Sequence, residues 1–360
     1  MKKTARISAV AFVAALSLAG CGDRPADESS EEPTTATESS SAPESSAAGE
    51  PVDFKACMVS DSGGFDDKSF NQTSYAGLQN AAANLGVETS EVESQSDTEY
   101  GDNIQALVDE GCNSVTTVGF LLGDATLEAA KANKDVDFSI VDFAYEKAPT
   151  NLKGLVFNTA EPSFLAGYLA AAKSESGTVG TFGGLNIPTV TAFMTGFMQG
   201  IERFNEDTGG DVQLLGWDGT DGSFTEDFED KSKGQSVAEG MIQQGADVIF
   251  PVAGPAGLGG LQAAQDADVK AVWVDTDGCV SAAEFCDVLL TSVMKGMDTS
   301  VEQSIADSLN EEFSNELYVG TLENDGVKLA PYADGEVDEE LAATLDDLKA
   351  QIIAGDIKTG

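Results

Sequence analysis

Short apolar runs alternate with longer segments of helical periodicity from about residue 52 to the end of the chain. Apolar runs rich in β-branched residues predict buried strands, and the periodic segments between them predict helices. This alternation of strand and helix is typical of parallel α/β sheets. We expect strands at 54–60, 86–92, 113–119, 137–142 and 153–158, and a second series at 178–183, 211–217, 246–252, 270–275 and 288–292.

The second series of strands repeats the first. "GCNSVTTVGF" from Gly111 resembles "GADVIFPVAG" from Gly245, and "DFSIVD" and "VKAVWVD" place Asp142 and Asp275 after similar strands at nearly the same offset. "CMVSDSGG" likewise resembles "VGTFGG" further upstream. Three matches in the same order predict two doubly wound, Rossmann-like lobes of one topology, with a ligand in the crevice at the carboxyl ends of their strands and a hinge that closes over it.

Each lobe is expected to be built from two separate segments of the chain. The helix predicted in "PSFLAGYLAAAKS" is expected to end at Gly177, where the chain crosses to the second lobe. We expect the first lobe to comprise 51–176 plus about 296–330. The second lobe comprises 177–295 plus about 331–360, and its final helix at 338–354 covers it.

The chain begins with features of an exported lipoprotein. Basic residues at its start precede "ISAVAFVAALSLAG", which is too short to span a bilayer and indicates a secretory signal over 1–21. "LAGC" resembles the lipobox of bacterial lipoproteins, in which Cys21 would carry the lipid. Residues 22–50 have no large apolar side chain and predict a flexible acidic Ser/Pro spacer. We expect a lipid-anchored protein on the extracytoplasmic face of the cell membrane.

Charge and composition exclude several functions. The formal net charge of −43 disfavours nucleic acid, because phosphate binding requires clustered Lys and Arg. Arg203 is the only arginine after the spacer, so a phosphorylated ligand would lack a guanidinium clamp. The chain has no histidine, which excludes His-based triads and His-ligated zinc. Catalysis by carboxylates or a lysine stays open on composition alone.

Four cysteines follow Cys21, an even number that favours two disulfides in an exported protein. Cys57 lies in the first predicted strand and Cys112 at the start of a candidate neighbouring strand, so we pair them. Cys279 and Cys286 flank a short loop and form the second expected pair.

The loop "DSGGFDDK" joins the first strand to the first helix. Its two glycines allow a sharp turn and the close approach of a ligand. Asp66 and Asp67 precede the helix, where a carboxylate caps free amides. Asp61 at the strand end has no such role, and Phe70 and Asn71 on the first helical turn can point into the cleft.

These residues carry a resemblance to a known family. "VSDSGGFDDKSFNQ", "GCNSVTTVGF", "FLAGYLAA", "VGTFGGLNIPTV", "GADVIFPVAG", "WVDTDG" and "LLTSVMKG" together resemble the basic membrane lipoprotein family of substrate-binding proteins. That family serves ABC importers and includes purine-nucleoside receptors. The resemblance covers nearly everything from Val52 onward. It implies a type I periplasmic-binding-protein fold, ABC permease and ATPase partners, no cofactor, no metal and no enzymatic activity. We expect a monomer.

The resemblance also implies roles for residues. Phe70 would stack on one face of a purine, and Phe250 on the other, with Phe224 as its competitor. Asp61, Asn71 and Asp142 would bind polar groups of the ligand. Asp275 or Asp277, with Lys295, would hold the ribose hydroxyls. The expected ligand-binding residues are Asp61, Phe70, Asn71, Asp142, Phe250, Gly254, Asp275, Asp277 and Lys295.

Three other functions compete. "GGFDD" resembles the metal loop of calcium-dependent nucleoside hydrolases, but Ser60 and Ser62 stand where that loop has aspartates, so the metal would lose ligands. "AGPAGLGGLQAA" lacks the third glycine of a dinucleotide fingerprint. A surface lipoprotein that binds another small solute for sensing stays open.

Overall fold

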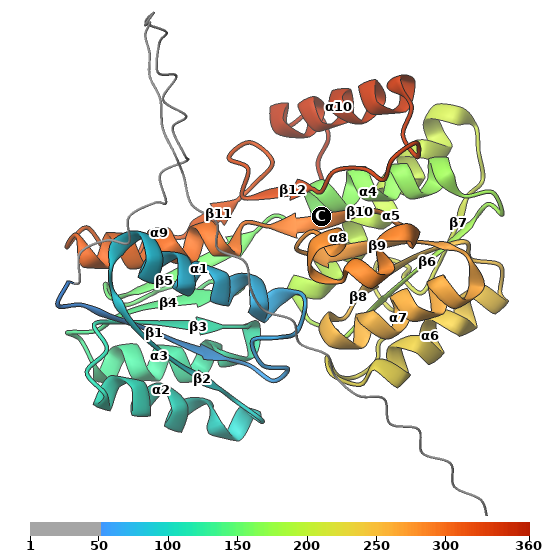
Figure 1. The fold of residues 1–360 in the computed structure, drawn as a ribbon. Helices are drawn as coiled ribbons and strands as arrows, with labels where there is room; N and C mark the ends of the chain where they lie inside the picture. The colour runs from blue at the N-terminus through green and yellow to red at the C-terminus, as the bar shows by residue number, and fades with distance from the viewer. Residues whose placement is uncertain (1–51) are drawn as a thin grey trace, which may run out of the picture. The chain divides into compact units, whose positions relative to one another are not determined.

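The structure is a computed structural model that describes residues 52–360 (Figure 1). The expected signal peptide, Cys21 and the spacer lie outside the described residues. No helix within 52–360 is long and apolar enough to cross a membrane.

The first lobe is a six-stranded parallel sheet in the order β11-β5-β4-β3-β1-β2. Its strands are β1 (Lys55–Ser60), β2 (Glu88–Glu93), β3 (Ser114–Val118), β4 (Asp137–Val141), β5 (Leu152–Phe157) and β11 (Tyr318–Gly320). Its helices are α1 (Phe70–Leu85), η1 (Asp97–Glu99), α2 (Tyr100–Asp109), η2 (Phe120–Leu122), α3 (Gly123–Ala132) and α9 (Met297–Leu309). The first five strands agree with the predicted ranges to within two residues.

Alternation along β1 explains why helices cover both faces of this sheet. Cys57 and Val59 pack with α2 and α3, whereas Ala56 and Met58 pack with α1 and α9. Successive side chains of a strand point to opposite faces, so a strand that is apolar at every position is buried on both sides.

The second lobe has the same strand order. Its sheet runs β12-β10-β9-β8-β6-β7, parallel except for β12 against β10. The strands are β6 (Thr178–Gly183), β7 (Gln213–Leu215), β8 (Val248–Val252), β9 (Lys270–Asp275), β10 (Leu289–Lys295) and β12 (Val327–Leu329). The helices are α4 (Ala160–Lys173), α5 (Pro188–Thr208), α6 (Lys231–Gln243), α7 (Gly254–Ala267), α8 (Gly278–Ser281), η3 (Ala283–Val288) and α10 (Glu339–Ala354). The two doubly wound lobes predicted from the repeat are confirmed.

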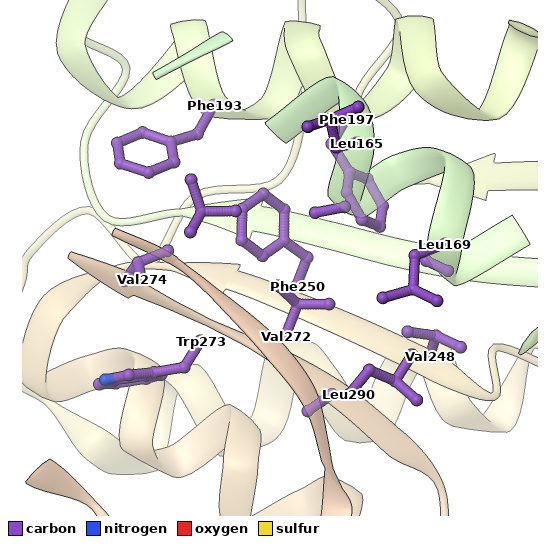
Figure 2. Packing of buried hydrophobic residues seen from close by; sticks show 14 of the residues in the cluster. Leu165, Leu169, Phe193, Phe197, Val248, Phe250, Val272, Trp273, Val274 and Leu290 are labelled. Carbon is purple, nitrogen blue, oxygen red and sulfur yellow. The ribbon is translucent and has the colours of Figure 1, made fainter. Parts of the chain in front are cut away.

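A dense core joins the second sheet to α4 and α5. Figure 2 shows Phe250 of β8 among Phe193 and Phe197 of α5, with Val272 of β9 beside it. Trp273 points to the opposite side of its strand, where it lies against Gly257 of α7.

The crossing to the second lobe lies earlier than expected. The sequence predicts it at Gly177, but α4 already packs against α5 and β10 of the second lobe. Glycines permit this contact, because a Cβ on Gly167 would lie 2.0 Å from the carbonyl oxygen of Phe197 and one on Gly200 would lie 1.9 Å from that of Phe164. The chain therefore leaves the first lobe between β5 and α4, and Gly177 lies inside the second.

Two more segments connect the lobes. One runs from Lys295 at the end of β10 into α9, and the other joins β11 to β12. We expected all of 296–330 to lie in the first lobe. The last part of this range does not, because β12 pairs with β10 in the second sheet. The segments run side by side, since the amide of Gly296 donates to Gly326 O at 2.9 Å and that of Asn158 donates to Gly320 O at 2.8 Å. The final helix α10 packs against α4 in the second lobe.

Both expected disulfides are present in the structure. Cys57 and Cys112 link β1 to the start of β3, with their Cα atoms 6.0 Å apart. Cys279 and Cys286 close the short turn formed by α8 and η3.

Candidate ligand-binding site

A cavity lies where the carboxyl ends of the strands of both lobes meet. From the first lobe it is lined by Asp61, which follows β1, by Phe70 and Asn71 of α1, and by Asp142, which follows β4. The second lobe contributes the ends of its own strands and the start of α7, namely Val252, Gly254, Asp275 and Lys295, with Phe193 and Phe228. The cavity volume is about 70 Å³. This is the crevice that doubly wound sheets use for ligands.

Lys295 joins the two lobes electrostatically. Its Nζ lies 2.6 Å from Asp142 Oδ2 and 3.4 Å from Asp275 Oδ1, and all three side chains are buried. Burial disfavours the ammonium, but the two carboxylates outweigh it and raise the pKa of Lys295. Burial also raises the pKa of Asp142, although Lys295 opposes the shift. The ammonium is therefore fixed in its charged form between two lobes.

Aromatic rings enclose the same ammonium. The Nζ of Lys295 lies 4.8 Å from the ring centroid of Phe70, 5.1 Å from that of Phe193 and 6.0 Å from that of Phe157. A cation over a ring face within about 6 Å is attracted by the ring quadrupole. These rings add a second attraction that holds the Lys295 ammonium in place between the lobes.

Asp67 sets the start of α1. Its carboxylate accepts from the backbone amides of Ser69 at 2.9 Å, Asn71 at 2.8 Å and Gln72 at 3.0 Å. Burial raises the pKa of Asp67 to about 6, although these bonds lower it. The capping role expected for this aspartate holds in the structure, and it places Asn71 on the cavity wall. Asp66 instead pairs with Lys68.

Asn71 in turn holds Asp61. The Nδ2 of Asn71 donates to Asp61 Oδ1 at 2.8 Å. Its Oδ1 is buried and has no donor among the described residues. Burial raises the pKa of Asp61 to about 8, and the Asn71 bond opposes this only in part.

Besides the bond from Lys295 to Asp142, two further hydrogen bonds cross between the lobes, and one of them is accepted by Asp275 of the cavity wall. Ser69 Oγ of the first lobe donates to Asp275 Oδ2 at 2.7 Å, and Trp273 Nε1 of the second donates to the Lys68 carbonyl at 3.3 Å. The other oxygen of Asp275, Oδ1, is buried and accepts no hydrogen bond from the described residues.

The structure brings seven of the nine expected ligand-binding residues to this cavity, and two lie elsewhere. Phe250 is fully buried, and its ring centroid is 4.7 Å from that of Phe197 and 6.3 Å from that of Phe193. It lies two residues before the end of β8 and faces the helices, so it belongs to the core (Figure 2). Asp277 accepts from the Cys279 amide at 2.9 Å and caps α8.

The competitor Phe224 is also outside the cavity. Its ring lies against Trp217, with centroids 6.3 Å apart, and against Gly183, where an added Cβ would lie 2.7 Å from it. The aromatic residues that the second lobe contributes are Phe193 and Phe228. Phe193 precedes Phe197 by one helical turn. In a sequence, this spacing of apolar residues indicates the buried face of a helix and gives no sign of a ligand-binding residue. Phe228 could have been found as an apolar residue in the acidic run "TEDFED" that no helix or strand pattern explains.

Comparison with known proteins identifies the family. Residues 54–359 match the family described as ABC transporter substrate-binding protein, PnrA-like. The chain belongs to this family. Its members are substrate-binding proteins and not enzymes.

Individual relatives agree with this assignment. The chain is 31% identical to the CD4+ T-cell-stimulating antigen of Listeria monocytogenes, over 85% of this chain and 88% of that protein. It is 30% identical to the ABC transporter nucleoside-binding protein BmpA of Lactococcus lactis subsp. cremoris, over 72% and 67%. An ABC transporter solute-binding protein of Aeropyrum pernix K1 has the same fold, with a TM-score of 0.76 at 23% identity over 85% of this chain and 92% of that chain.

Proposed function

We propose that this protein is the membrane-anchored receptor of an ABC importer and that it captures purine nucleosides between its two lobes. A lipid on Cys21 would hold it on the extracytoplasmic face of the cell membrane. The observation that carries the proposal is a pair of buried acceptors in one cavity. Asn71 Oδ1 of the first lobe has no donor among the described residues, and Asp275 Oδ1 of the second accepts no hydrogen bond there and has only the Lys295 ammonium at 3.4 Å. Buried acceptors normally have a partner, and a ligand with several donors would provide both.

The aromatic residues support a flat ligand. Phe70 and Phe228 are each partly exposed, so each retains surface for a ligand, whereas Phe193 is 2% exposed. We therefore assign the two faces of the base to Phe70 and Phe228. Stacking on an aromatic side chain contributes on the order of 1 to 3 kcal/mol per contact.

The carboxylates support a ribose. Asp275 can accept from vicinal hydroxyls through its free oxygen, and Lys295 beside it can donate. Asp277 does not fit the role of ribose ligand, because its carboxylate accepts from the Cys279 amide at the start of α8. The choice between the two aspartates thus falls on Asp275.

Charge argues against a nucleotide. Lys295 is the only basic residue among those that line the described cavity, and two aspartates already neutralise it. A phosphate would be buried beside Asp67 with no free cation among the lining residues to offset its charge. An uncharged nucleoside avoids this repulsion.

Entry of a nucleoside requires motion. The cavity of about 70 Å³ is smaller than the roughly 300 Å³ at the lower end of small-molecule sites. Separating the lobes would break the Ser69–Asp275 bond and enlarge the site, and the three connecting segments would act as the hinge.

Calorimetry tests the function. Residues 52–360 would be unfolded and refolded to remove any bound ligand and then titrated with adenosine, guanosine, inosine, ribose and AMP. We expect saturable heat with nucleosides and none with AMP. Absence of heat with every nucleoside would contradict the proposal, and release of free base and ribose would indicate a hydrolase.

A further inference from the structure

The two aspartates that the sequence repeat places at matching strand ends are each held by a hydrogen bond from the opposite lobe. Asp142 of the first lobe accepts from Lys295 Nζ of the second at 2.6 Å. Asp275 of the second lobe accepts from Ser69 Oγ of the first at 2.7 Å, and this is the one hydrogen bond that its carboxylate accepts within residues 52–360. The orientation of the Asp275 carboxylate therefore depends on a donor from the other lobe.

The position of Ser69 normally gives a serine a different role. Ser69 is the N-cap of α1, where a serine hydroxyl usually accepts from a backbone amide of the first helical turn. In this helix the Asp67 carboxylate accepts from the amides of Ser69, Asn71 and Gln72, and the Ser69 side chain forms no capping bond. The Ser69 hydroxyl is therefore free to donate across to Asp275.

The backbone around Ser69 is fixed on both sides. Its amide donates to Asp67 Oδ1 at 2.9 Å, and its carbonyl accepts from the amide of Thr73 at 3.1 Å and from the Thr73 hydroxyl at 2.7 Å. Trp273 Nε1 of the second lobe donates to the Lys68 carbonyl one residue earlier, at 3.3 Å. Ser69 is also fully buried, so its hydroxyl is shielded from solvent. It is a rigid donor of the first lobe.

The second oxygen of Asp275 gives this bond a consequence for the ligand. Asp275 lines the cavity, and its Oδ1 is buried, accepts no hydrogen bond from the described residues and has the Lys295 ammonium at 3.4 Å. Rotation of a carboxylate group about the bond that carries it is soft, so a hydrogen bond to one oxygen also orients the other. With Oδ2 bound to Ser69, Oδ1 is the oxygen that is left for a ligand hydroxyl.

We propose that Ser69 is a positioning residue for the ribose of the bound nucleoside and that it acts through Asp275. When the lobes close, the Ser69 hydroxyl fixes Asp275 Oδ2 and leaves Oδ1 to accept from a ribose hydroxyl, so the two bonds strengthen each other. When the lobes open, the ribose acceptor loses its orientation. The proposal rests on the proposed function, and it adds that selectivity for a sugar with hydroxyls depends on Ser69.

The test compares two ligands. Calorimetry would measure the affinity of full-length wild type and Ser69→Ala for adenosine and for 2′,3′-dideoxyadenosine, which lacks both ribose hydroxyls. We expect Ser69→Ala to bind adenosine about tenfold more weakly, because it loses a hydrogen bond to a charged group. The loss for adenosine should be at least about threefold larger than the loss for dideoxyadenosine, because bonds in one network are coupled.

A matched control removes a buried hydroxyl elsewhere in the first lobe. Ser300 of α9 is buried, and its hydroxyl donates to the Met297 carbonyl of the same helix at 3.2 Å. Ser300→Ala should leave both affinities unchanged.

A second variant tests whether Ser69 acts through Asp275. Residue 275 has a left-handed backbone, which glycine tolerates, so Asp275→Gly removes the carboxylate without backbone strain. In this background, Ser69→Ala should weaken adenosine binding by less than about twofold more. A further loss of about tenfold would show a structural role that is independent of Asp275 and would overturn the proposal.

The outcomes separate this inference from the proposed function. Equal losses for the two ligands, or no loss in Ser69→Ala, would overturn the positioning role while adenosine binding by the wild type stays intact. Absence of adenosine binding by the wild type would overturn the proposed function and this inference together. Should Ser69→Ala fail to fold, Ser69→Gly takes its place with the same expected losses, because glycine is also accepted at an N-cap. Should Asp275→Gly fail to fold, the two-ligand comparison decides alone.

Discussion

Asp142 and Asp275 occupy equivalent positions in the two lobes and share one cation. Asp142 follows β4 and Asp275 ends β9, both have a left-handed backbone, with φ values of +66° and +68°, and both are 6% exposed. Lys295 lies 2.6 Å from one and 3.4 Å from the other. Aspartate tolerates this backbone conformation better than most residues. The two aspartates that the sequence repeat places at equivalent positions therefore contact the same ammonium, that of Lys295.

Removing that ammonium should destabilise the fold. Lys295→Met leaves two buried aspartates without their cation, which typically costs about 3 to 5 kcal/mol. Urea unfolding followed by circular dichroism measures it, and Lys134→Met, at an exposed lysine, is the matched control.

The pH dependence of this variant has a definite sign. Without Lys295 the pKa of Asp142 rises further, and a carboxyl with a raised folded-state pKa loses stability as pH increases through that pKa. The deficit of Lys295→Met should therefore be larger at pH 7 than at pH 5. An equal deficit at both values would contradict the shared-charge account.

Phe70→Ala and Phe228→Ala should weaken adenosine binding, each by at least about 1 kcal/mol, because each removes a stacking surface. Neither should greatly change the free energy of unfolding, since both rings are partly exposed. Phe250→Ala is the matched control and should instead lose about 3 to 5 kcal/mol of stability, as fully buried phenylalanines do. Unchanged affinity in Phe228→Ala would remove this ring from the site.

The two disulfides should differ in their contribution to stability. The bond between Cys57 and Cys112 closes a sequence separation of 55 residues, and that between Cys279 and Cys286 one of 7. Chain entropy gives about 4 kcal/mol for the first and about 2 kcal/mol for the second. Unfolding of the Cys57→Ala/Cys112→Ala and Cys279→Ala/Cys286→Ala variants checks this order, and a larger loss from the short loop would contradict it.

The proposed membrane anchor is a lipid on Cys21. Cells grown with labelled palmitate should incorporate the label into the wild-type protein, which should sediment with membranes. Cys21→Ser should lose the label and appear in the extracytoplasmic fluid. Retention of Cys21→Ser on the membrane would show a different anchor.

The sequence predicted the polar residues at the strand ends of the site better than its aromatic residues. Strand ends are marked by the change from apolar to polar residues, which is why Asp61, Asp142 and Asp275 were found. Phe250 was misplaced because a residue two positions before the end of β8 points to the helices and not to the cleft. Phe228 was missed because its segment has no periodicity that shows where a side chain lies.

The crossing between the lobes was misplaced for a related reason. The sequence shows that "PSFLAGYLAAAKS" is helical, but an apolar helix packs equally well on either lobe. What decides is the close approach of α4 to α5 at Gly167 and Gly200, a tertiary contact that periodicity does not contain.

The most direct measurement compares adenosine affinity in the wild type, Asp275→Asn and Asp277→Asn by calorimetry, with circular dichroism to verify folding. Asp275 faces the ligand cavity, whereas Asp277 caps α8 two residues later. The loss of a charged hydrogen bond is worth about 1.5 to 3 kcal/mol, so binding to Asp275→Asn should be at least about tenfold weaker, with Asp277→Asn unchanged. Equal affinity in all three proteins, or a loss confined to Asp277→Asn, would contradict a nucleoside held between the lobes.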